Sequence, residues 1–189
     1  FVLGLSMAFS MTLQAQTSTD TERLLFAQEK VYSKRNSILK GIHIPNIGPT
    51  VMSGRITDLD VNPDNPSEMI VAYASGGLWY SNNNGTTFSP ISDELPTLTI
   101  GDFAVNWKSK TIWLGTGEAN SSRSSYAGYG LFKSTDFGKK WEYVNLSESH
   151  HISRVILDEE NANRVWVAVI GHLYTQNAER GVFLTEDGG

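Results

Sequence analysis

Short apolar or alternating segments recur from residue 44 onward, and turns rich in glycine, proline and asparagine separate them. Apolar residues alternate with polar ones in segment 55–61 and run almost together in segment 164–170. Segments of this length and pattern, bounded by turn residues, predict β-strands. Because short turns join most of them, each group should form an antiparallel sheet with its strands in chain order. The expected strands are 55–61, 68–74, 77–81 and 87–91 in a first group, 100–105, 111–115, 130–134 and 141–145 in a second, and 151–157, 164–170 and 181–185 in a third.

One turn motif follows the third expected strand of each group. It is complete at 134–141, where Asp136 can accept hydrogen bonds from turn N–H groups, Gly138 can adopt a positive φ, and the Ser134 hydroxyl can tie the two ends together. Trp141 then leaves the turn as a large apolar side chain. The first copy of the motif carries substitutions and consists of Ser81, Asn83, Gly85 and Phe88. The third copy is cut short and consists of Thr185, Asp187 and Gly189.

The motif copies start 53 and 51 residues apart. A period near 50 with one hairpin motif per unit predicts an all-β, multi-bladed β-propeller of four-stranded antiparallel blades. About three incomplete blades are present, and propellers have about 4–8 blades. We therefore expect the sequence to be a piece of a longer protein, with two apolar blade faces left uncovered.

The turn motif resembles the Asp-box, or bacterial neuraminidase (BNR), repeat of sialidases, xyloglucanase-type glycoside hydrolases and the sortilin family. The segments Ser-Gly-Arg-Ile-Thr at 53–57, Ala-Ser-Gly-Gly-Leu-Trp at 74–79 and Gly-Thr-Gly-Glu-Ala-Asn at 115–120 are most similar to bacterial secreted proteins of the sortilin N-terminal-domain type. The resemblance covers about residues 47–189. It implies a structural role for the motif residues and a role for the propeller in binding a peptide or a carbohydrate.

The enzyme relatives differ from this sequence at two positions that matter for chemistry. Sialidases carry Arg-Ile-Pro near the first blade, whereas Arg55 and Ile56 are followed here by Thr57. Xyloglucanase-type hydrolases place a catalytic aspartate two residues before a Gly-Gly pair, and the corresponding residue here is Ala74. Glycoside hydrolysis uses two carboxylates. A non-enzymatic recognition module is therefore expected; the alternative is a glycoside hydrolase whose carboxylates lie partly in further blades.

The loop 116–129 is the best candidate for ligand binding, because long loops on a rigid scaffold usually carry functional groups. Glu118 could act as an acid or base and Arg123 could bind an anion, while Asn120 and Tyr126 could hydrogen-bond a sugar. The structural alternative is that Glu118 and Arg123 form an ion pair with each other or with a neighbouring blade.

The first 43 residues differ in pattern from the rest. Residues 1–16 resemble a secretory signal peptide that has lost its start: the segment is apolar, uncharged and too short to span a bilayer. It implies a secreted, periplasmic or cell-surface protein; a buried N-terminal helix is the alternative. Residues 17–43 are expected to form a helical lead-in, with basic residues toward its C-terminal half, before the propeller begins at 44.

Composition excludes several other functions. The net charge is −5 and the pI about 5.3, so nothing favours a nucleic-acid partner. The absence of cysteine excludes disulfides and thiolate metal sites. The acidic segment 58–64 resembles a calcium loop, but Pro63 and Met69 occupy positions that need glycine and a carboxylate. The four histidines lack a zinc-like spacing, so neither a metal nor another cofactor is expected.

Overall fold

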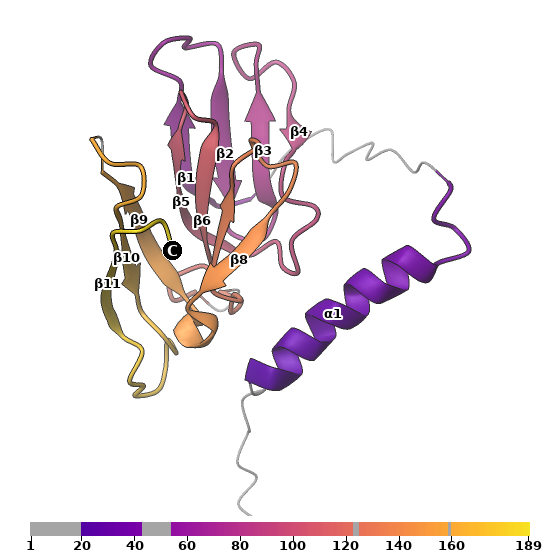
Figure 1. The fold of residues 1–189 in the computed structure, drawn as a ribbon, viewed down its shortest axis with the longest axis vertical. Helices are drawn as coiled ribbons and strands as arrows, with labels where there is room; N and C mark the ends of the chain where they lie inside the picture. Colours follow the sequence, from indigo (N-terminus) through magenta and orange to yellow (C-terminus); the bar gives the residue numbers. More distant parts are fainter. Residues whose placement is uncertain (1–19, 43–53, 123–124, 159) are drawn as a thin grey trace, which may run out of the picture.

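The computed structural model describes residues 20–42, 54–122, 125–158 and 160–189 (Figure 1). The expected signal peptide at 1–16 and the candidate residue Arg123 therefore lie outside the described residues. The described part consists of one α-helix followed by three antiparallel β-sheets, each a meander with its strands in chain order. This arrangement is the one that the sequence pattern predicts.

Each sheet corresponds to one expected blade. Blade 1 contains β1 (Ile56–Val61), β2 (Met69–Tyr73), β3 (Gly77–Ser81) and β4 (Ser89–Pro90). Blade 2 contains β5 (Ile100–Asn106), β6 (Thr111–Thr116), β7 (Leu131–Ser134) and β8 (Glu142–Asn145). Blade 3 contains β9 (Ile152–Leu157), β10 (Val165–Val169) and β11 (Gly181–Thr185). A short 3-10 helix, η1 (Ser147–Ser149), connects blades 2 and 3.

The first strands of the three blades lie next to one another, since β5 contacts both β1 and β9. Each of these strands carries a β-bulge near its start, at Thr57, Gly101 and Ser153. A Cβ atom at Gly101 would lie 1.8 Å from the Ile152 carbonyl oxygen, so only glycine permits this approach of β5 to β9. A bulge bends its strand and changes the direction of the next side chain. Asp58, Asp102 and Arg154 directly follow the three bulges.

Alternation along β6 explains how the blades stack. Ile112 and Leu114 belong to the core between blades 1 and 2, whereas Trp113 belongs to the core between blades 2 and 3. All three side chains are fully buried. Successive side chains of a strand point to opposite faces of the sheet, so a strand covered on both faces needs apolar residues at every position. Each such burial stabilises the fold by about 1.5–3 kcal/mol.

The two outer faces of the stack are apolar and exposed, as the sequence analysis expects for three blades. On blade 1 this face includes Leu59 and Val61. On blade 3 it includes Ile156, Val182 and Leu184. In a closed propeller ring, further blades would cover such faces.

The helix α1 (Asp20–Asn36) lies to one side of the blades and ends at Asn36, inside the helical lead-in expected at 17–43 (Figure 1). The Lys30 Nζ donates to the Leu95 carbonyl oxygen at 2.9 Å, and Lys34 forms an ion pair with Glu94. Its side chains Phe26 and Tyr32 are exposed. Among the described residues, neither α1 nor η1 is long and apolar enough to cross a bilayer.

Candidate ligand-binding face

The meander topology divides the turns between two ends of the blades. The hairpin motifs connect the third and fourth strands, at the same end as the turns between first and second strands. Three segments lie at the opposite end: loop 117–130, which is the candidate loop of the sequence analysis, loop 170–180 and the connection 146–151. We call this opposite end the long-loop face.

Two hydrogen bonds of the hairpin motif recur in all three copies. At 134–141, the Ser134 Oγ donates to Asp136 Oδ1 at 2.9 Å, and the Gly138 N–H donates to Ser134 Oγ at 2.8 Å. The Lys140 N–H donates to Asp136 Oδ1 at 2.8 Å and is the main reason why the pKa of Asp136 lies below its ordinary value. Gly138 has φ 82°. The corresponding hydrogen bonds join Ser81, Asn83, Gly85 and Thr87 in blade 1, and Thr185, Asp187 and Gly189 in blade 3.

Each of the second and third turns also contacts the blade before it. The Trp141 Nε1 donates to the Ile91 carbonyl oxygen of blade 1 at 2.9 Å, and its ring packs on the core between blades 1 and 2. The Gly188 carbonyl oxygen of blade 3 accepts a hydrogen bond from Lys133 of blade 2 at 2.9 Å. These turns therefore hold blades together at the end opposite to the long-loop face. Phe88 occupies the position of Trp141 in the first copy.

Glu118 is fully buried at the long-loop face, and hydrogen bonds satisfy both of its carboxylate oxygens. Arg55 of blade 1 donates from Nη1 to Oε1 at 3.0 Å and from Nη2 to Oε2 at 2.9 Å. The Asn120 N–H donates to Oε1 at 2.8 Å, and the Ser125 hydroxyl donates to Oε2. Burial alone would raise the pKa of Glu118, but the hydrogen bonds from Ser125, Arg55 and Asn120 outweigh it and lower the pKa. Glu118 thus pairs with a neighbouring blade.

The other candidate residues of loop 116–129 lie at the surface. Asn120 is exposed, and the Tyr126 side chain is 59% exposed. Tyr174 from loop 170–180 is 76% exposed, and its hydroxyl donates to the Ser122 carbonyl oxygen at 3.4 Å. Two tyrosines and an amide therefore belong to the exposed part of this face. Sequence reasoning missed Tyr174, because only the fold brings its loop to the loop of Tyr126.

The backbone of this face is tied to the blades. The Gly128 N–H donates to the His150 carbonyl oxygen at 2.6 Å, and His151 Nδ1 lies 2.8 Å from the Glu118 carbonyl oxygen. Gly117 has φ 86°, and a Cβ atom there would lie 1.9 Å from the His150 carbonyl oxygen. These contacts hold the two ends of the loop, at Gly117 and Gly128, against the connection between blades 2 and 3.

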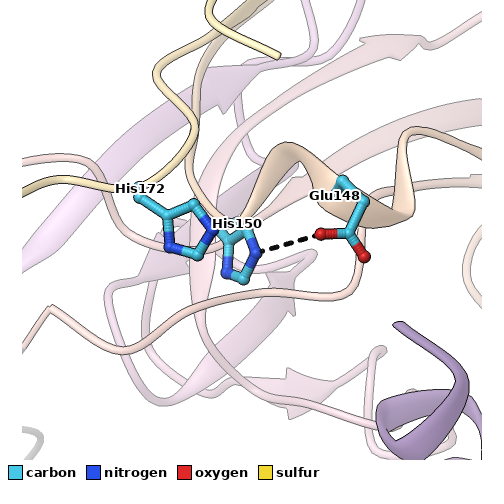
Figure 2. A group of neighbouring side chains, drawn as sticks. All are labelled: Glu148, His150 and His172. Atoms are coloured by element: carbon cyan, nitrogen blue, oxygen red, sulfur yellow. Dashed lines mark ion pairs between the residues drawn. The ribbon is translucent and has the colours of Figure 1, made fainter. Parts of the chain in front are cut away.

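A cluster of Glu148, His150 and His172 lies on the same face (Figure 2). The Glu148 Oε2 and His150 Nε2 atoms are 3.5 Å apart, and the rings of His150 and His172 meet at an angle of 34° with centroids 3.6 Å apart. The sequence analysis expects no metal site because these residues lack a zinc-like spacing. The three residues meet because the η1 connection and loop 170–180 return to the same place.

A second group of ionisable residues lies on the first strands of the blades. Asp102 is 2% exposed; the Val155 N–H donates to its Oδ2 at 2.7 Å, and Arg154 Nη1 lies 3.5 Å from its Oδ1. Burial raises the pKa of Asp102 to about 7, and the neighbouring Asp58 contributes to the increase. The sequence analysis weighed Asp58 only as part of a calcium loop. Asp102, the neighbour of Asp58, is missed because it lies on another blade.

No protein-family model matches the sequence, and no curated protein matches it. Among solved structures, the chain is similar to an ancestral GH74 enzyme, with 24% identity and a TM-score of 0.55 over 71% of this chain and 18% of that one. It is also similar to the GH74 xyloglucanase from Xanthomonas campestris, with 13% identity and a TM-score of 0.52 over 68% of this chain and 20% of that one. YCF48 from Cyanidioschyzon merolae matches with 17% identity and a TM-score of 0.44 over 71% of this chain and 34% of that one.

The chain spans about a fifth of the length of these two GH74 enzymes. At such low identity, the likeness shows the fold alone. The three antiparallel sheets packed side by side and the structural likeness to the two GH74 enzymes together show that the chain forms blades of a β-propeller.

Proposed function

We propose that this chain belongs to a secreted recognition propeller, with Asp-box turns of the bacterial sortilin N-terminal-domain type, that binds a peptide or glycan on its long-loop face. The observation that carries the proposal is the contrast between Glu118 and its neighbours. The Glu118 carboxylate is buried and its oxygens are occupied, whereas Asn120, Tyr126 and Tyr174 are exposed. Hydrogen-bonding and aromatic groups on a fixed backbone suit binding without chemistry.

The nature of the exposed groups supports a ligand with hydroxyl or amide groups. A tyrosine ring offers an apolar face and a polar edge, so it can pack on a sugar ring or a peptide side chain while its hydroxyl remains hydrated. The Asn120 amide can both donate and accept a hydrogen bond. The expected signal peptide at 1–16 supports secretion.

Glycoside hydrolysis is the second candidate, and one observation favours it. The pKa of Asp102 is raised to about 7 beside Asp58, and a carboxyl group that keeps its proton near neutral pH can act as a general acid. Against this candidate, Asp102 is buried, and Ala74 occupies the position of the catalytic aspartate in xyloglucanase-type enzymes.

The experiment is to pass the full-length protein over immobilised xyloglucan, β-glucans, sialylated glycans and a peptide library. Retention is measured together with the release of reducing ends and free sialic acid. The proposal expects retention on one ligand class without release, and a loss of affinity of about tenfold or more for Tyr126→Ala. Tyr143→Ala is the matched control, because Tyr143 is a 43% exposed tyrosine on β8, beside the hairpin turn at the opposite end of the blades.

Two results would contradict the recognition proposal. Sugar release that disappears in Asp102→Asn would favour hydrolysis instead. Ligand retention that is equally strong in the wild type and in Tyr126→Ala would place binding away from the long-loop face.

A further inference from the structure

Three potential metal ligands converge where blade 2 passes into blade 3. Glu148 lies in η1, His150 directly follows η1, and His172 comes from the loop between β10 and β11 (Figure 2). The nearest ligand atoms of all three residues lie within 4.8 Å of one another. We propose that Glu148, His150 and His172 form a binding site for a divalent transition-metal ion, with Zn²⁺ as the preferred ion.

The residue types fit this ion. Two imidazole nitrogens and one carboxylate oxygen are a ligand set that zinc uses, with bonds of about 2.0–2.2 Å. In a tetrahedral site with such bonds, neighbouring ligand atoms lie about 3.3 Å apart. The Glu148 oxygen and His150 nitrogen already lie 3.5 Å apart. A ligand nitrogen of His172 lies within 4.8 Å of both. Calcium and magnesium prefer oxygen ligands, so the two histidines disfavour them.

The backbone holds the cluster in a shape that costs conformational energy. His150 has φ 49° and ψ −51°, in the positive-φ region that residues other than glycine rarely adopt. Such strain persists where the surrounding structure imposes it, and it concentrates at functional sites. Here the Gly128 N–H donates to the His150 carbonyl oxygen at 2.6 Å and helps to fix this conformation.

The loop that carries His172 is fixed by its own contacts. Asn177 Nδ2 and Arg180 Nη2 each donate to the His172 carbonyl oxygen at 3.3 Å. The Arg180 Nε also donates to the Ile170 carbonyl oxygen at 2.9 Å. Gly171 has φ 70°, and a Cβ atom there would lie 1.8 Å from Asn177 Oδ1. The loop therefore presents His172 to His150 from a turn in which Gly171 adopts a positive φ.

Two of the three residues of the cluster are partly exposed to solvent. His150 is 6% exposed, but Glu148 and His172 are half-buried. Glu148 also lines a pocket of about 200 Å³, together with Glu179 and Phe183. Three protein ligands leave the fourth zinc position to water or to a ligand group. A bound ion would also tie the connection between blades 2 and 3 to loop 170–180.

The experiment uses the full-length protein, freed of metal with a chelator that is then removed. Zn²⁺ is titrated in competition with a chromophoric chelator, and Co²⁺ is titrated with visible absorption as the readout. We expect one Zn²⁺ per chain and the intense visible bands of four-coordinate Co²⁺. His172→Asn and Glu148→Gln should each weaken Zn²⁺ binding by at least about tenfold, since even the loss of an outer partner costs that much.

Glu142→Gln is the matched control, because Glu142 is an exposed carboxylate on β8 outside the cluster, and it should bind Zn²⁺ as the wild type does. Circular dichroism of each variant checks that the fold is retained; Glu148→Gln replaces a half-buried side chain and should fold even if His172→Asn does not. The proposal is overturned if the wild type binds no stoichiometric Zn²⁺, or if folded Glu148→Gln binds it as tightly as the wild type.

Discussion

Arg55 and Glu118 form a two-pronged ion pair across the interface of blades 1 and 2, although they lie 63 residues apart in the chain. The carboxylate is fully buried, while the guanidinium is 39% exposed. Arginine presents its N–H groups in a fork that matches the two oxygens of a carboxylate. The pair therefore fixes the position of the Glu118 loop relative to blade 1.

Removing Arg55 should destabilise the protein strongly, because it leaves the buried Glu118 carboxylate without its charged partner. We expect Arg55→Ala to lower the free energy of unfolding by about 2–4 kcal/mol, somewhat less than for a pair buried on both sides. Urea unfolding of the full-length protein measures the change.

Arg164→Ala is the matched control for Arg55→Ala. The Arg164 side chain is 40% exposed, but its partners Asp158 and Glu186 are 19% and 66% exposed. Ion pairs that water reaches contribute about 0–1 kcal/mol. Equal losses for the two arginine variants would show that burial of Glu118 does not matter.

Asp102 should make the protein less stable as the pH rises. Its pKa is raised from 3.8 to about 7 in the folded chain, so between these values the native state binds more protons than the unfolded state. Stability from this group is therefore present at low pH and falls as the pH rises from about 4 to about 7. Asp102→Asn removes the titration but keeps an acceptor for the Val155 N–H.

The measurement is the urea midpoint of the wild type and of Asp102→Asn at pH 5, 6, 7 and 8. The free energy of unfolding of Asp102→Asn minus that of the wild type should be larger at pH 8 than at pH 5. Parallel pH profiles for the two proteins would contradict the raised pKa, whatever their absolute stabilities.

Gly138→Ala should loosen the contact between blades 1 and 2. Gly138 has φ 82°, and a Cβ atom there would lie 2.7 Å from the Ile91 carbonyl oxygen. Strain of this kind costs about 1–3 kcal/mol. Thermal unfolding tests it against Gly181→Ala, where no atom lies within 4 Å of the added Cβ and the expected change is within about 0.5 kcal/mol. A loss of stability at Gly181 as large as that at Gly138 would exclude this explanation.

Trp141 should tolerate another aromatic residue better than alanine. Its indole N–H donates to the Ile91 carbonyl oxygen, and its ring packs on the core between blades 1 and 2. Trp141→Ala loses both contacts and should cost about 3 kcal/mol. Trp141→Phe keeps most of the packing, as Phe88 does in the first turn, and should cost about 1 kcal/mol. Chemical denaturation distinguishes the two; equal costs would mean that the indole N–H, and not the ring, makes the main contribution.

The sequence alone determined the strands, the turn motifs and the repeat. These features depend on residues close in the chain: alternation sets which side chains share a face, and the acceptor of Asp136 or Asn83 closes its turn on N–H groups within four residues. The sequence also identified loop 116–129 as a candidate site. It left the role of Glu118 open, since the residue type fits both an ion pair and a reacting group.

Only the tertiary structure decided what each candidate contacts. Glu118 is paired with Arg55 because β1 and β5 lie side by side, and no local pattern encodes that neighbour. His150 and His172 contact each other because the connection between blades 2 and 3 and the loop 170–180 of blade 3 meet at the same end of the molecule. Burial and electrostatic environment, which set the pKa of Asp102, arise only when separate blades pack together, because each depends on groups that are distant in the chain.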